Sequence, residues 1–239
     1  MEFKKMTYAL LLCGQYRNFS DRLPSLSEHV LKQDDWHIYA YCQEEDPKDG
    51  ERLEADLSAW PHSIICEPVA DFDEADYLTE NPIRDYYGDL TPLQAHLKKL
   101  WGLKRVTEML EDEGREHPLC VRARFDNEYL TPLEPLESFD PHCLYVPKHD
   151  NWDGYHDGFA VGGTPLMLAY GTLFDTVSNN WQAKGMIKAE CHVKWHLELL
   201  GIEVRRTSIT SQRIRHGEVW GPCFHSDRGD ILDLAIKSP

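Results

Sequence analysis

The sequence predicts an α/β fold: one domain over residues 1–239, with a mostly parallel central sheet that helices cover on both faces. Two observations lead to this prediction. Short apolar runs of strand length alternate along the chain with longer segments of helical spacing. No internal repeat and no low-complexity linker divides the 239 residues, a length that one large α/β domain can occupy. Because ligands bind at the carboxyl ends of strands in such sheets, polar residues there are the first candidates for a functional site.

The first part of the chain alternates strand and helix. The run "TYALLLC" is continuously apolar, as strands buried on both faces are. The segment "LPSLSEHVL" has helical spacing, with Ser25 as its expected cap. An acidic, aromatic and irregular segment closes this part. In chain order we expect a strand at 7–13, a helix at 23–31, a strand at 36–42, a helix at 49–60, a strand at 63–68 and the irregular segment at 69–91.

The second part opens with the longest expected helix, 92–114, whose leucines mark one apolar face and whose stop signal is Gly114. The apolar runs "LCVRARF" and "CLYVP" predict strands, and a Gly- and Asp-rich loop follows them. The expected elements are strands at 119–125 and 143–147, the loop at 148–163, helices at 164–178 and 189–200, and a strand at 202–209.

Composition narrows the class of protein. The chain carries 41 acidic and 25 basic residues, a net charge of −16, which argues against general nucleic-acid binding. The seven cysteines form no CxxC pair, and with no secretory segment they favour a reducing, cytoplasmic compartment. The apolar run at the start is too short to span a bilayer, so no transmembrane segment is expected.

The first expected strand ends in "CGQYRNF". Gly14 allows a tight turn or a close approach to a ligand, and Gln15 and Arg17 add an amide and a guanidinium beside it. This pattern suits a phosphate-bearing ligand, although a turn with surface polar residues gives the same pattern. Neither a GxGxxG nor a GxxxxGK[ST] motif occurs, so dinucleotide-binding and P-loop proteins are poor matches.

The stretch "LCVRARFDNEYL" places two arginines at alternate positions of an expected strand. Arg122, Arg124 and Asp126 share one face of the strand, because side chains alternate with period two. Two cations and a carboxylate at a strand end can bind an anion together with a metal ion or a sugar hydroxyl. The alternative is a structural arginine–aspartate salt bridge, whose burial carries a desolvation cost.

The loop "KHDNWDGYHDGFAVGG" combines acids, histidines and aromatic rings. Rings that stack on a sugar and carboxylates that accept from its hydroxyls suit a carbohydrate site, whereas the alternative is a solvated acidic loop. The sequence turns apolar directly after Asp157, which places that carboxylate at the boundary of the core. In the later helix, His192 and His196 lie four residues apart, but the HExxH pattern is absent, and Glu190 falls in the first turn, where the helix dipole favours a carboxylate.

Taken together, these segments resemble a family of bacterial and viral glycosyltransferase-like proteins with a GT-A-type nucleotide-diphospho-sugar transferase fold. The resemblance rests on "GQYR" after the first strand, on a helix carrying Gln94 before "VRARFDNEY", on "YHDGFAVGG" after "YVP", and on "AECHVKWHLELLGIEV". The ordered set covers about residues 7–216, and no single motif is diagnostic. It implies a GT-A-like, Rossmann-like sheet.

The resemblance also implies roles for individual residues. Gly14 and Arg17 fall at the nucleotide loop, and Asp126 falls at the last acid of the DxD-like metal motif. Arg124 stands where the first acid of that motif is expected, which puts dependence on Mn²⁺ or Mg²⁺ in doubt, because an arginine can neutralise the diphosphate directly. Asp157 falls where an acceptor-side carboxylate is expected, and Glu190 is a second candidate.

The leading functional hypothesis is a glycosyltransferase that moves a sugar from a nucleotide-diphosphate donor to a hydroxyl of a glycan or other acceptor. Its expected residues are Asp157 or Glu190 as the base; Gly14, Gln15, Arg17, Gln94, Arg122 and Arg124 for the donor; Asp126 for a divalent metal; and Trp152, Tyr155 and His156 for the acceptor. One alternative is a metal-dependent hydrolase built on His149, Asp150, His156, Asp157, His192 and His196. Another is a sugar- or nucleotide-binding protein without catalysis.

Overall fold

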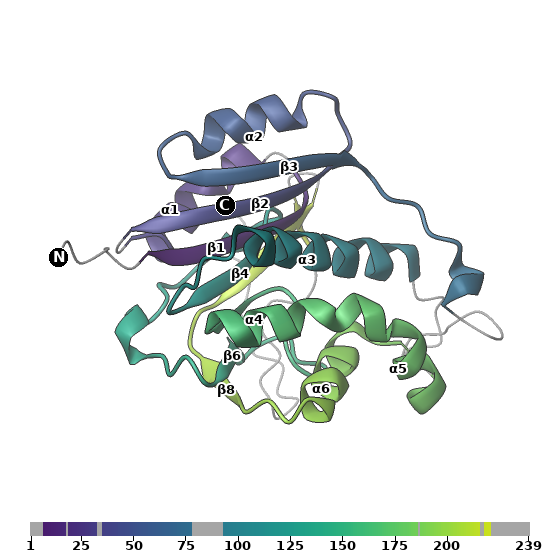
Figure 1. Ribbon diagram of the computed structural model, residues 1–239. Helices are drawn as coiled ribbons and strands as arrows, with labels where there is room; N and C mark the ends of the chain where they lie inside the picture. The colour runs from purple at the N-terminus through teal and green to yellow at the C-terminus, as the bar shows by residue number, and fades with distance from the viewer. Residues whose placement is uncertain are drawn as a thin grey trace, which may run out of the picture.

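A seven-stranded sheet forms the centre of the protein in the computed structural model, which describes residues 7–17, 19–32, 35–77, 93–185, 187–215 and 218–220 (Figure 1). The strands lie in the order β3-β2-β1-β4-β7-β6-β8. Their bounds are β1 (Tyr8–Gln15), β2 (Trp36–Glu44), β3 (His62–Pro68), β4 (Cys120–Arg124), β6 (Leu144–Pro147), β7 (Ala160–Gly162) and β8 (Val204–Thr207).

The sheet is mostly parallel, as the sequence predicts. Four of its six neighbouring pairs are parallel, and only β7 runs against both of its neighbours, β4 and β6. The sequence did not predict β7, because its three residues lie inside the glycine-rich segment that was expected to be a loop. By inserting between β4 and β6, β7 brings the preceding loop residues beside the end of β4.

Helices cover both faces, as predicted. Alternate residues of β1 belong to two apolar clusters, with Leu10 and Leu12 on one side and Leu11 on the other. The first side packs against α1 (Leu23–His29) and α2 (Asp49–Leu57). The second side packs against α3 (Leu93–Glu113), α4 (Thr164–Gly171), α5 (Val177–Lys184) and α6 (Ala189–Leu199). In Figure 1, α3 and α4 run side by side across this second face.

Helix α3 crosses the carboxyl end of β1 at close range. A Cβ atom at Gly102 would already lie 3.6 Å from both the Cβ of Cys13 and the backbone nitrogen of Gly14. The apolar face of the helix, which includes Leu103 and Val106, is fully buried against the sheet. The close crossing places the first two turns of α3 directly above the strand ends.

A second, antiparallel sheet of three strands in the order β10-β9-β5 was not predicted from the sequence. Its strands are β5 (Asn127–Tyr129), β9 (Ser211–Arg215) and β10 (Glu218–Trp220). Strand β5 follows β4 after two residues, and Asn127 pairs with Arg213. The backbone nitrogen of Ile214 also donates to the carbonyl of Asp126 at 2.8 Å. This small sheet therefore fixes a late segment of the chain beside the end of β4.

Most expected elements differ from the structure by one to three residues at an end, as with the helix expected over 49–60, which ends at Leu57. The helix expected over 164–178 divides into α4, a 3-10 helix (Thr172–Thr176) and α5. Threonine hydroxyls account for the division, since Thr172 and Thr176 donate to the carbonyls of Ala169 and Leu173 and compete with regular helical bonding. The last expected strand is limited to Val204–Thr207. Part of the irregular segment, 78–91, lies outside the described residues. None of the described helices is both long and apolar enough to cross a membrane.

Candidate functional site

A cavity of about 550 Å³ lies at the carboxyl ends of β1, β2 and β4. Its walls also come from the start of α3, the loop before β7, the first turn of α6 and strand β9. The lining residues are five cations (Arg17, Lys98, Lys99, Arg124 and Arg213), three acids (Asp126, Asp157 and Glu190), and the largely neutral remainder Cys13, Gly14, Gln15, Gln43, Gln94, Ala95, His96 and Ala189. The cavity is therefore rich in positive charge although the whole chain carries −16.

The sheet register explains why the strand ends meet here. Cys13 of β1 lies beside Arg124 of β4, and Gln15 lies beside Gln43 of β2. The backbone takes unusual angles near the end of β1, with φ of 134° at Gly14, one of its last two residues, and 43° at Arg17, just beyond it. A side chain other than hydrogen is disfavoured at the first of these angles. The turn carries Arg17 back over the end of β4.

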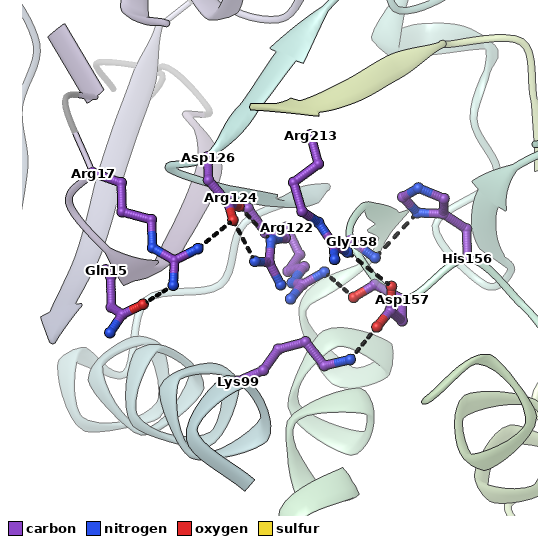
Figure 2. A network of polar contacts seen from close by, with 10 residues as sticks. All are labelled: Gln15, Arg17, Lys99, Arg122, Arg124, Asp126, His156, Asp157, Gly158 and Arg213. Atoms are coloured by element: carbon purple, nitrogen blue, oxygen red, sulfur yellow. Dashed lines mark hydrogen bonds and ion pairs between the residues drawn. The ribbon is translucent and has the colours of Figure 1, made fainter. Parts of the chain in front are cut away.

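Arg124 and Asp126 form a two-pronged pair at the end of β4 (Figure 2). Arg124 Nε and Nη2 each donate to one oxygen of Asp126 at 2.7 Å, and Arg17 Nη1 approaches the second oxygen at 3.4 Å. Burial opposes ionisation of Asp126, but the adjacent Arg124 outweighs it and holds the pKa of that carboxyl below its ordinary value. Both residues are ionised at neutral pH. Their contact places the two side chains on the same side at the end of β4, as predicted, although the strand itself ends at Arg124.

The surroundings of Asp126 do not fit the divalent metal expected there. Both of its oxygens already accept from Arg124, so a metal ion would have to displace a guanidinium group from a buried carboxylate. The other acids of the cavity come from other elements, and Asp157 is itself paired with a lysine. Arg124, which stands where the resemblance leads us to expect a first acid, thus supplies no ligand oxygen and occupies both oxygens of Asp126.

Asp157 lies in the same network, held from three directions (Figure 2). Arg122 is 1% exposed, and its Nη1 donates to the backbone carbonyl of Asp157 at 2.5 Å. The carboxylate forms an ion pair with Lys99, and Arg213 Nη2 lies 4.0 Å from its other oxygen. Burial disfavours the charged carboxylate, but Lys99 and Arg213 outweigh it and hold the pKa well below the ordinary value. Arg122 acts behind the cavity wall: it orients Asp157 rather than lining the site.

Glu190 has a different environment from the other two acids. It lies in the first turn of α6, and within the described part of the chain its carboxylate forms no hydrogen bond or ion pair with another residue. Burial, together with the nearby charge of Asp157, raises its pKa to about 7. Its backbone is fixed by the loop before β7: Tyr155 N donates to its carbonyl at 2.9 Å, and Gly154 packs directly on its peptide group.

The amide residues expected to hold the donor reach the cavity with their side chains partly engaged. Gln15 accepts a hydrogen bond from Arg17 and donates to Glu45 Oε1 at 2.8 Å. Gln94 donates to the carbonyl of Phe72 at 2.5 Å. Both therefore help to position the cavity walls.

The three residues expected to bind the acceptor lie away from the cavity. Trp152, Tyr155 and His156 do not belong to the lining found among the described residues. The guanidinium of Arg206 stacks 5.0 Å from the ring of Tyr155, and Lys188 lies 5.9 Å from that of Trp152. His156 is buried and accepts from Gly158 N at 3.1 Å. These three residues contact neighbouring segments of the protein instead of the cavity. The chain turns inward after them, so Asp157 lines the cavity and they do not.

The residues of the expected hydrolase centre separate into two groups. His149, Asp150 and His156 place one possible ligand atom each within 4.8 Å of one another, whereas His192 and His196 belong to α6 and bond to Thr176. In the first group, backbone N–H groups donate to Nε2 of His149 and Nδ1 of His156. In a neutral imidazole the proton then sits on the other nitrogen, which blocks metal binding there. Three of the six residues expected for a hydrolase therefore lie together, whereas Asp157 lines the cavity and His192 and His196 lie in α6.

Sequence reasoning missed Lys98, Lys99, His96 and Arg213. The helix 92–114 contained a signal for His96 and Lys99. Ala95, Lys99 and Gly102 follow helical spacing on one face, and His96 is next to Ala95. Small residues on that face indicate close contact with the sheet, so the polar residues among them point to a site. Arg213 gave no such signal, because only the pairing of β5 with β9 brings it to the cavity.

The comparisons with known proteins give no family for this chain. A scan against models of protein families found no match, and a search of curated proteins found no significant relative. The functional conclusion therefore depends on the geometry and charge of the cavity.

Proposed function

We propose that the protein is a glycosyltransferase that moves a sugar from a nucleotide-diphosphate sugar to a hydroxyl group of an acceptor. The observation that carries the proposal is the concentration of five cationic side chains around one cavity of a strongly acidic protein. Asp126 and Asp157 offset part of this charge, and the cations left in excess favour an anionic ligand. A volume of about 550 Å³ suits a ligand of nucleotide-sugar size.

Arginines are the side chains best suited to hold the donor diphosphate, since each can donate two parallel hydrogen bonds to phosphate oxygens. Arg17, Arg124 and Arg213 surround the same part of the cavity. As the bond between the sugar and the diphosphate breaks, its electron pair remains on a phosphate oxygen, and these cations stabilise that charge. No step is assigned to a metal ion.

Glu190 is the better candidate for the general base. A base must be ionised, accessible and close in pKa to the working pH, and Glu190 combines a cavity position with a pKa of about 7. It takes the proton of the acceptor hydroxyl while the oxygen bonds to the anomeric carbon of the donor sugar. Asp157, whose carboxylate is paired with Lys99, is a weaker base and serves to place that lysine.

A cytoplasmic location is part of the proposal. The six cysteines in the described residues are all free, as expected in a reducing compartment, and this supports the proposed location.

A thermal-shift screen against UDP-, GDP-, CMP- and dTDP-linked sugars tests the proposed function. Ligand linkage raises the melting temperature only for a donor that binds the folded state. We expect one nucleotide class to raise it, followed by transfer of the sugar to an acceptor hydroxyl or to water. Adding Mn²⁺ should not be required for binding. A flat response to the whole panel would contradict the proposal.

A further inference from the structure

A chain of hydrogen bonds runs from the cavity into the protein through three buried histidines. His96 lines the cavity, and its Nε2 lies 3.3 Å from Nδ1 of His192. His192 Nε2 lies 3.1 Å from the hydroxyl of Thr176, which lies 3.3 Å from Nδ1 of His196. His196 Nε2 ends the chain 3.1 Å from the carbonyl of Ala169. The chain connects α3, α6 and the 3-10 helix before α5.

The carbonyl at the end of the chain fixes the direction of its hydrogen bonds. A carbonyl only accepts, and the hydroxyl of Thr172, which lies 3.3 Å from the same Nε2, gives its own proton to that carbonyl. The proton of neutral His196 therefore sits on Nε2, and its Nδ1 must accept. Thr176 is the neighbouring donor for that Nδ1, and its oxygen then accepts from Nε2–H of His192. If the hydroxyl proton pointed to the carbonyl of Leu173 instead, the oxygen would still accept from His192.

The same reasoning reaches the cavity. With its proton on Nε2, His192 accepts at Nδ1, and the partner that donates there is Nε2–H of His96. His96 Nδ1 is therefore a bare acceptor, and it forms no hydrogen bond with another residue in the described part of the chain. Burial, Lys99 and His192 all lower the pKa of His96 well below its ordinary value, so the ring stays neutral.

We propose that His96 Nδ1 forms a subsite that accepts a hydrogen bond from a hydroxyl group of the donor sugar, with His192, Thr176 and His196 as the positioning residues that fix its tautomer. This inference rests on the proposed function. A fully ionised phosphate has no proton to donate and is repelled by a lone pair, so Nδ1 of His96 does not bind a phosphate oxygen. The cavity is thereby divided between arginines, which take the diphosphate, and His96, which takes the uncharged sugar.

The tautomer can be measured without any ligand. Long-range ¹⁵N–¹H spectra of protein labelled at histidine distinguish protonated from bare ring nitrogens, and His96→Gln identifies the signals of His96 by their loss. We expect neutral rings with the proton on Nε2 at His96, His192 and His196. A proton on Nδ1 of His96 would overturn the inference, because the cavity would then face a donor.

Binding tests the subsite directly with His96→Gln. Its amide nitrogen replaces Nε2 and can still donate to His192, but the variant has no acceptor where Nδ1 was. The probes are the nucleotide sugars of the screen and the same nucleotides without sugar, measured by calorimetry. We expect about tenfold weaker binding of the cognate nucleotide sugar, as for one lost hydrogen bond, with unchanged binding of the sugar-free nucleotide. His142→Gln, at an exposed histidine, is the matched control.

The outcomes separate this inference from the proposed function. If a nucleotide sugar binds the wild type and His96→Gln equally well, or if the variant loses affinity for both probes alike, the subsite is wrong and the proposed function stands. If no nucleotide sugar binds the wild type, both are wrong. His96→Asn adds a check on folding: its amide oxygen lies near the former Nδ1, so it should bind the nucleotide sugar better than His96→Gln does.

Discussion

Three carboxylates share one cavity, yet their protonation differs because each has different neighbours. Asp126 accepts two hydrogen bonds from Arg124, and Asp157 is paired with Lys99, so cations hold both acids ionised. Glu190 is buried beside the charge of Asp157 without such a partner, and its pKa rises to about 7. A pair of carboxyl groups whose pKa values are pushed apart is a frequent arrangement at sites of acid–base chemistry.

The first prediction concerns Glu190→Gln. If Glu190 is the base, turnover should fall by about 10²- to 10⁴-fold, because the amide cannot take the hydroxyl proton. The activity of the wild type should rise as the pH increases through about 7, where the carboxyl loses its proton. Rate profiles between pH 5.5 and 8.5 measure this, with donor affinity as the control. A variant that retains the pH-dependent rise would assign the base elsewhere.

The second prediction concerns Arg124. Replacing it with alanine removes a donor contact worth about one to two decades in affinity, but it also leaves Asp126 buried without its partner, which costs about 3–5 kcal/mol of stability. Arg124→Lys should recover part of the affinity, because it keeps the charge but not the two-pronged geometry. Calorimetry with the donor and thermal melting report the two effects separately.

A double variant separates the two roles of Arg124. Arg124→Ala with Asp126→Ala leaves no buried carboxylate without its arginine and should melt above the single alanine variant. If Arg124 binds the donor, the double variant should still bind it weakly. Donor affinity equal to that of the wild type would show that the arginine–aspartate pair is structural.

At the scale of elements, the loop before β7 and the start of α6 act as one unit. Tyr155 N donates to the carbonyl of Glu190, Lys188 Nζ lies 3.4 Å from Asp153, and Cys191 lies 3.6 Å from the carbonyl of Trp152. These contacts fix the loop on the helix and so place Asp157, at its end, on the same side as Glu190. The aromatic residues of the loop thereby support the site from outside the cavity.

The third prediction is that Gly154→Ala separates this loop from α6. A Cβ at this position would lie 2.0 Å from the carbonyl carbon and oxygen of Glu190, so the loop must move. We expect a loss of about 1–3 kcal/mol in stability and a fall in turnover larger than the fall in donor affinity. Gly114→Ala is the control: its φ of 62° strains the backbone of alanine, but nothing lies within 4 Å of the added Cβ, whereas at Gly154 the cost is a direct clash. Equal turnover in the two variants would contradict the coupling.

At the scale of the whole molecule, buried neutral histidines make stability depend on pH. Burial lowers the folded-state pKa of His96, His149, His156 and His192 below 6.5, to about 4 for His149 and about 3 for His192. Below pH 6.5 the unfolded chain therefore binds protons that the folded protein does not, and stability falls as the pH falls. Glu190 acts in the opposite direction, because its folded-state pKa is raised.

The fourth prediction follows from the directions of these pKa shifts. Each buried histidine lowers the free energy of unfolding by about 1.4 kcal/mol over the first pH unit below 6.5. Glu190 offsets roughly the loss caused by one histidine. The summed loss from four histidines approaches the free energy of unfolding of a marginally stable domain. Denaturant titrations at pH 7.5 and 5.5 should show a loss of a few kcal/mol. Equal stability at the two values would show that the histidines are not buried as neutral rings.

The alternation of strands and helices was predictable because it depends on local apolar spacing, which the chain displays residue by residue. The same holds for the shared face of Arg122, Arg124 and Asp126, which follows from the period of two along a strand. Gly14 and Arg17 could be assigned to the candidate site because they lie at the end of the first strand, and both line the cavity. Each of these inferences uses residues that are close together in the sequence.

The tertiary structure alone decided which of these residues share a cavity and which stand behind it. Arg213 reaches the site through the pairing of β5 with β9, and β7 enters the sheet against its neighbours. The aromatic residues of the acidic loop, expected at the ligand, pack outside it, and Asp126 meets arginine where a metal was expected. The physical reason is that charge pairing, burial and pKa depend on contacts between segments far apart in the chain, which local spacing does not encode.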